Sequence, residues 1–169
     1  MKICCVEFNI VLLLILASGG LGCQSLKEKN VTTLRLHLEV NNPDRLGVGQ
    51  SVSIGKTEIF SLLTEKEPFL DEGHVKKASV VKALGGFSIL LQLDRHGSWV
   101  LEQYSTAERG KRVAIFGEFG EARWLAAPVL NHTIKDGAFT FTPDMTLDEA
   151  YRFVEGLNNV AEKVQKHNP

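Results

Sequence analysis

The sequence has little of several features that would place a protein in a specialised class. Its 169 residues include only five prolines and three cysteines, and 19 basic side chains balance 20 acidic ones for a formal net charge of -1. So few prolines, with 15 glycines, exclude a collagen-like or low-complexity chain. A chain with neither net positive charge nor a long basic tract has no electrostatic basis for binding nucleic acid, and no such partner is expected.

Motifs for catalysis and metal binding are also missing. The sequence has no Gly-x-Ser-x-Gly motif, and Gly85-Gly86 precedes a strand pattern, whereas a phosphate-binding loop would open a helix. Asp71, Glu72 and His74 have a spacing that matches no closed metal-ligand set. His37 alternates with apolar residues and is expected to face water. We therefore predict no catalytic residue, no metal and no cofactor.

The amino-terminal residues follow the order of a secretory signal. Lys2 precedes an apolar run over residues 10–16, and small residues follow as far as Gly22. This run is too short to cross a hydrocarbon core of ~30 Å as a stable helix, but it suits the central region of a signal. We predict a lipoprotein-type signal peptide over residues 1–22. A retained membrane anchor and a buried amino-terminal helix are the alternatives.

Cys23 is the only cysteine outside this predicted signal. Leu21-Gly22-Cys23 resembles the lipobox of bacterial lipoproteins, although Gly20 stands where that pattern usually has Leu. The resemblance implies lipidation of Cys23, attachment to a membrane through the lipid, a tether over residues 23–31, and a place on the periplasmic side of the cell envelope. Gln24 resembles the sorting signal for the outer membrane, which we favour over the inner one. Plain secretion is the alternative.

Alternating apolar and polar residues predict β-strands in the rest of the chain. Gly85-Gly86 is expected to supply the turn of one hairpin, and Trp99 and Trp124 are expected to fill the core. Pro128 lacks an amide donor, which predicts an edge or irregular strand there. The predicted strands cover residues 34–40, 52–54, 59–63, 78–81, 87–93, 112–116, 124–130 and 139–141.

Two helices complete the predicted fold. Ser98 is expected to cap the first, which ends near Gly110. Thr146 and Glu149 form a capping box for the second, in which Gly156 weakens the helix and could lead to a break within two or three residues. The patterns together predict one α+β domain over residues 32–169, with a mostly antiparallel sheet and two main helices packed on one face.

The order of short motifs along the chain is more specific than any one of them. Leu91-Gln92-Leu93-Asp94 is followed by Thr106, Gly110-Lys111, Ala126-Ala127-Pro128, Ile134-x-x-Gly137 and Thr146-x-x-Glu149-Ala150. From about Glu58 to Asn158 this order resembles the head subdomain of the first periplasmic domain of SecD, the accessory subunit of the bacterial protein-export translocon. The resemblance implies structural roles for the motif residues Asp94, Thr106, Gly110, Lys111, Pro128, Gly137, Thr146, Glu149 and Ala150.

The chain departs from that family in two ways. Residues 117–122 replace a shorter Asp-Gly turn, and the transmembrane bundle that the family's proton-driven work needs has no counterpart among the apolar runs. We therefore expect a noncatalytic envelope lipoprotein that binds protein or peptide, with a link to protein export. The alternatives are an assembly lipoprotein that docks on one fixed envelope complex, and an enzyme whose site is built from scattered residues.

Overall fold

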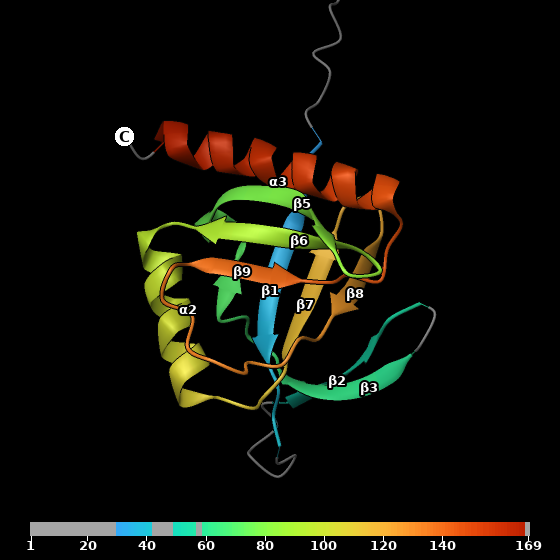
Figure 1. The fold of residues 1–169 in the computed structure, drawn as a ribbon, viewed down its shortest axis with the longest axis vertical. Coiled ribbons are helices and arrows are strands. Elements are labelled where there is room, and N and C mark those ends of the chain that lie inside the picture. The colour runs from blue at the N-terminus through green and yellow to red at the C-terminus, as the bar shows by residue number, and fades with distance from the viewer. Residues whose placement is uncertain (1–29, 42–48, 57–58, 168–169) are drawn as a thin grey trace, which may run out of the picture.

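The computed structural model describes residues 30–41, 49–56 and 59–167. The predicted signal peptide, Cys23 and the tether up to residue 29 lie outside these ranges, so lipidation stays a prediction. Figure 1 shows two packed sheets, a hairpin and two long helices.

The strands are distributed over two sheets and one hairpin, and every strand pair is antiparallel. The four-stranded sheet has the order β4 (Leu70–Asp71), β1 (Thr33–Leu38), β7 (Val113–Glu118), β8 (Ala122–Ala126). The three-stranded sheet has the order β5 (Val75–Ala83), β6 (Gly86–Leu93), β9 (Ala138–Phe141). The separate hairpin contains β2 (Gly49–Ile54) and β3 (Phe60–Glu65).

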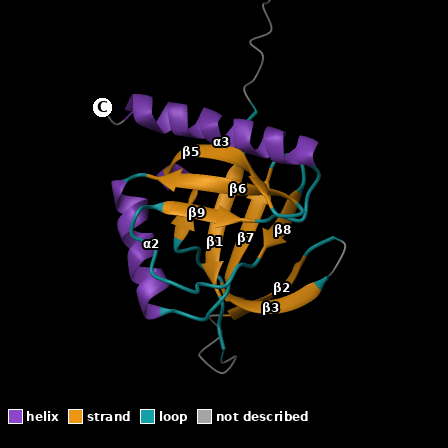
Figure 2. Ribbon diagram, viewed as in Figure 1, coloured by secondary structure: helices purple, strands orange, loops and turns teal. Residues whose placement is uncertain are grey.

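The helices cover two sides of these sheets. In Figure 2, α3 (Leu147–His167) runs along β5, and α2 (Arg95–Ala107) stands beside the ends of the strands. A 3-10 turn, η2 (Glu72–His74), leads into β5 and also contacts α3. The α+β class with mostly antiparallel strands is confirmed. Among the described residues, no helix combines the length and apolar character needed to cross a bilayer.

The main core lies between the two sheets and α3. Leu34 and Leu36 from β1 and Ile89 and Leu91 from β6 are each at most 1% exposed, and Phe153 of α3 packs into the same cluster. The alternation of apolar residues in β1 and β6 directs one face of each strand to this core, as the sequence pattern predicted.

The β2–β3 hairpin has a smaller core of its own. Val52, Ile54 and Leu62 pack against Ala114, with Trp124 partly buried beside them. Because Ala114 belongs to β7, the hairpin covers the outer face of the four-stranded sheet. That cover overturns one expectation: His37, which the alternation placed in water, is only 4% exposed. Its Nδ1 lies 2.9 Å from the carbonyl oxygen of Glu65.

Helix α2 begins four residues earlier than the sequence predicted. Asp94, rather than Ser98, is its N-cap, because the Asp94 carboxylate accepts the N–H of Gly97 over 2.7 Å. In this helix Leu101 is fully buried and Trp99 is 55% exposed, so the expectation that Trp99 fills the core is wrong. Trp124 is partly buried, as predicted.

Helix α3 runs without a break from Leu147 to His167. The expectation of a break near Asn158-Asn159 is therefore wrong. A Cβ atom at position 156 would lie 2.0 Å from the Thr32 hydroxyl oxygen, so the glycine lets the chain ahead of β1 approach the helix. Strand β7 also extends through Gly117 and Glu118, two residues beyond its predicted end.

Candidate functional site

A groove of about 680 Å³ opens between the β2–β3 hairpin and the adjoining ends of β8 and β9. We call it the β8–β9 groove. Its walls come from five separate parts of the chain, and most of its wall residues are apolar. The apolar residues that line it are Ile54, Phe60, Leu125, Ala126, Ala127, Pro128, Phe141 and Pro143.

Two sheets end at this groove, because β8 and β9 are each the last strand of their sheet. The outer edge of β8 is partly used, because the Leu125 carbonyl accepts the N–H of Asp144 over 2.9 Å. Just beyond the strand, the Ala127 carbonyl accepts from Arg112 Nη1 over 3.0 Å. The outer edge of β9 pairs with no other strand in the described ranges. The groove therefore combines an apolar lining with an unpaired strand edge.

Polar groups at the groove are few and well placed. The guanidinium of the exposed Arg112 lies 5.7 Å from the centre of the Phe60 ring, which fixes a cation over an aromatic face. The side-chain hydroxyl groups of Ser88 and Thr142 form a hydrogen bond with each other over 2.9 Å. Thr140 and Asp144 are the other polar side chains of the lining.

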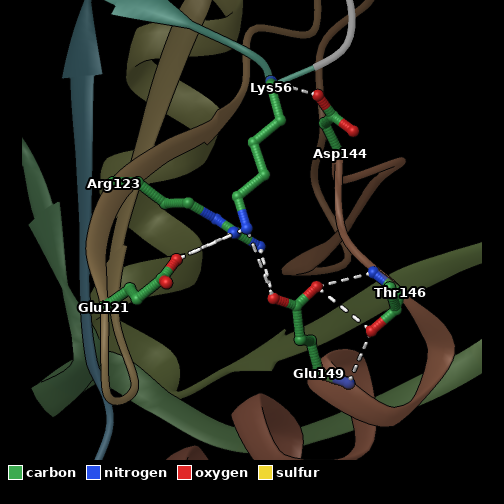
Figure 3. Close-up of polar contacts among 6 residues, drawn as sticks. All are labelled: Lys56, Glu121, Arg123, Asp144, Thr146 and Glu149. Carbon is green, nitrogen blue, oxygen red and sulfur yellow. Dashed lines mark hydrogen bonds and ion pairs between the residues drawn. The ribbon is translucent and has the colours of Figure 1, made fainter.

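An ion cluster holds the hairpin beside the groove (Figure 3). The backbone N–H of Lys56 donates to the carboxylate of Asp144, a residue of the groove wall. Lys56 Nζ lies 3.4 Å from Glu121 Oε2 and 3.7 Å from Glu149 Oε1. Arg123 joins the same two acids, with 3.3 Å contacts to each. The cluster thereby ties the hairpin to β8 and to the start of α3.

Glu149 is the most strongly perturbed acid of this cluster. The N–H of Thr146 donates to its carboxylate over 2.7 Å, and Arg123 lies against the other carboxylate oxygen. The hydrogen bond from the Thr146 backbone, with those from Arg123 and the Thr146 hydroxyl, lowers the pKa of Glu149 to about 2 despite its burial. The predicted capping box is therefore present, and it also anchors the ion cluster.

The motif residues at the start of α2 lie together. Asp94 caps the helix, and the carbonyl of Gly137 accepts the N–H of Leu93 over 3.0 Å. Gly137 has φ 66°, and a Cβ there would lie 2.0 Å from Ser98 Oγ. Glycine is required at this position both by its backbone conformation and by the space available.

A second group of motif residues forms the connection from α2 to β7. Gly110 has φ 89°, and its N–H donates to the carbonyl of Leu130 over 2.9 Å. Leu130 in turn donates to the carbonyl of Lys111, and the Pro128 carbonyl accepts the N–H of Val113, each over 2.9 Å. Of the nine motif residues, only Pro128 lines the β8–β9 groove.

The remaining motif residues support the ends of the helices. The Thr106 hydroxyl donates to the carbonyl of Glu102 over 2.7 Å. It also lies 3.2 Å from the hydroxyl of Thr133. Ala150 is fully buried below the capping box. The motif residues thus fall into three separate structural groups and do not converge on one site.

The acids and histidine considered as metal ligands have other partners. Asp71 accepts the N–H of Gly73 over 2.9 Å, Glu72 accepts the N–H of Leu34 over 3.0 Å, and His74 Nδ1 lies 3.4 Å from Asp94 Oδ2. Within the described ranges no group of three or more His, Cys, Asp and Glu side chains could hold a metal ion.

Sequence reasoning missed the residues that build the groove. Phe60, Arg112 and Asp144 come from segments far apart in the chain, and each has an unremarkable local sequence. The Ala-Pro segment that ends in Pro128 was the only local signal near it. Its proline and small side chains indicate a strand edge that another chain can approach.

No protein-family model and no curated protein matches this sequence. Among solved structures, one described as the membrane component SecDF that enhances protein export matches with a TM-score of 0.55 and 15% identity, covering 90% of this chain and 68% of that one. A crystal structure of SecDF in a super-membrane-facing form matches with a TM-score of 0.55 and 16% identity, covering 77% of this chain and 19% of that one. The fold of this chain is therefore SecD-like, as the order of its motifs predicted.

Proposed function

We propose that this chain is a noncatalytic domain of the bacterial cell envelope that binds extended segments of polypeptide in the β8–β9 groove. The observation that carries the proposal is the unpaired edge of β9 beside an apolar groove. An incoming strand would pair with the backbone of β9 and place alternate side chains on the apolar walls. Backbone pairing would supply affinity with little dependence on sequence.

The SecD-like fold supports a link to protein export, because one of the matching structures is described as a component that enhances export. A domain serving that process would meet chains that have not yet folded, and such chains expose both backbone and apolar side chains. The lipid on Cys23 would hold the domain on the periplasmic side of a membrane, with the outer membrane favoured by Gln24.

The binding test compares two neighbouring residues of the hairpin. Phe60 lines the groove and is 41% exposed, whereas Ile59 does not line it and is 68% exposed. The affinity of the full-length chain for a fluorescent, reduced and alkylated polypeptide is measured by anisotropy. We expect Phe60→Asp to weaken binding at least tenfold and Ile59→Asp to change it less than twofold. Absence of binding by the parent chain, or equal losses in both variants, would contradict the proposal.

The anchor is tested separately by membrane fractionation of cells that express Cys23→Ser. We expect the variant to leave the membrane fraction, because the cysteine is the only acceptor in the lipobox-like segment. Crosslinking of the parent chain in the same cells identifies its partners. Many unfolded clients would support polypeptide capture, whereas a single stoichiometric partner would favour the assembly role.

A further inference from the structure

A second cavity, of about 760 Å³, lies between α2 and the ends of β1 and β3. We call it the α2 cavity. Three carboxylates line it, from Glu65, Glu102 and Glu108, and no lysine or arginine does. This concentration of negative charge contrasts with the near-neutral charge of the whole chain.

Two aromatic side chains form part of the same lining. Trp99 is 55% exposed, and Tyr104 stacks on Phe69 with ring centres 4.3 Å apart and planes inclined by 16°. The stacking fixes the phenol ring. A large exposed indole beside carboxylates provides both parts of a cation site: an aromatic face for the alkyl stem and charge, and acceptors for the N–H groups.

The three carboxylates of the α2 cavity differ in whether a basic side chain already pairs with them. Glu108 Oε2 lies 2.6 Å from Lys111 Nζ, whereas the carboxylates of Glu65 and Glu102 form no ion pair within the described part of the chain. Burial, followed by the charges of Glu65 and Glu108, raises the pKa of Tyr104. The negative potential of Glu65 and Glu108 therefore reaches Tyr104 in the aromatic wall of the cavity.

The α2 cavity and the β8–β9 groove border the same short segment. Glu108 lines the cavity and Arg112, four residues later, lines the groove. Four residues span at most about 14 Å even when the chain is fully extended. The linings of the groove and the cavity therefore come close together at this segment, within reach of one bound polypeptide.

We propose that the α2 cavity binds a lysine or arginine side chain of the polypeptide whose apolar segment occupies the β8–β9 groove. This inference rests on the proposed function and adds a preference for chains with a basic residue close to an apolar segment. The aliphatic stem of the basic side chain would lie on Trp99, and its charged group would meet Glu65 and Glu102.

The test uses two synthetic peptides that share an apolar segment and differ only in an arginine or a glutamine four residues beyond it. Their affinities for the full-length chain are measured by anisotropy. We expect the arginine peptide to bind at least fivefold more tightly. This preference should fall below twofold in the double variant Glu65→Gln, Glu102→Gln, and it should persist in the matched control Glu155→Gln, whose exposed carboxylate lies on α3 away from the cavity.

Fluorescence gives an independent readout of the cavity. The chain has two tryptophans, so Trp124→Phe makes Trp99 the only one that is excited at a wavelength selective for tryptophan. We expect the arginine peptide, but not the glutamine peptide, to change Trp99 emission. The same change produced by free argininamide at the concentrations used for the peptide would overturn the proposal, because it would indicate a site for small cations.

The outcomes separate the two proposals. Equal, measurable binding of both peptides would overturn the cation site and leave polypeptide binding in the groove standing. Failure of both peptides to bind would overturn both proposals. A preference for arginine that survives the double variant would place the charge recognition elsewhere and would also overturn the cation site.

Discussion

Arg123 and Glu149 form an ion pair of 3.3 Å that joins β8 to the first turn of α3. The arginine side chain is 13% exposed and the glutamate side chain 17%, so the pair is largely shielded from solvent. The same glutamate caps α3 and contacts Lys56 from the hairpin. One carboxylate thus links three elements around the β8–β9 groove, and its ionisation should be visible in the stability of the fold.

The first prediction concerns acid stability. Glu149 has an ordinary pKa of 4.5 and a pKa of about 2 in the folded chain. Because the folded pKa is the lower one, its contribution to stability is complete above pH 4.5 and is lost as the pH falls towards 2. We expect Glu149→Gln to lower the free energy of unfolding by about 1–2 kcal/mol at neutral pH. Urea denaturation at several pH values should show a smaller difference between variant and parent as the pH approaches 2.

The second prediction concerns the start of α2. Asp94→Ala removes the carboxylate that accepts the Gly97 N–H, and we expect a loss of about 1 kcal/mol in the free energy of unfolding. Ser98→Ala removes only a hydroxyl that donates to the Asp94 carbonyl, and we expect about half that loss. Urea denaturation of the two variants measures both values. A larger loss for Ser98→Ala would restore the helix start that the sequence suggested.

Local patterns predicted many of the strands because the apolar face of each is buried, in the main core or in the smaller core of the hairpin. Leu34, Leu36 and Leu38 alternate in the sequence and are all buried in the structure. The same pattern failed for His37, because the opposite face of β1 is covered by a hairpin that is distant in sequence. Burial by another element cannot be read from the strand itself.

The candidate site was less accessible to prediction than the fold. Binding of protein or peptide and an edge strand at Pro128 were expected, but Phe60, Arg112 and Phe141 meet only after the two sheets and the hairpin are assembled. Trp99 shows the same limit. Its helical spacing suggested the core, whereas the packing of α2 buries Leu101 and places Trp99 in the lining of the α2 cavity.

The third prediction concerns the close approach of α3 to Thr32. In a free helix, Gly156→Ala would add about 1 kcal/mol of stability. Here the new methyl group would lie 2.0 Å from Thr32 Oγ1 and 2.8 Å from its Cβ, so we expect a net loss of about 1–3 kcal/mol. Thermal unfolding of Gly156→Ala and of the double variant Thr32→Ala, Gly156→Ala provides the measurement. The double variant should be less destabilised by the alanine at 156, and a higher melting temperature for Gly156→Ala alone would contradict the observed contact.

The fourth prediction concerns His37. Burial lowers its pKa below 6.5, with a further contribution from Arg35, and the hydrogen bond to the Glu65 carbonyl only partly opposes this. As the pH falls through 6.5, the unfolded chain takes up a proton before the folded chain does, so stability decreases until the folded pKa is reached. We expect the parent chain to become less stable as the pH falls from 7.5 to 5.5.

His37→Gln should lack this loss, because glutamine can donate to the Glu65 carbonyl without titrating. Urea denaturation of both chains at pH 7.5, 6.5 and 5.5 gives the comparison. Carboxylates such as Glu149 are present in both chains, so the difference between them isolates the histidine. Parallel pH profiles for the two chains would show that the imidazole can be protonated without cost, and therefore that the hairpin does not cover it in solution.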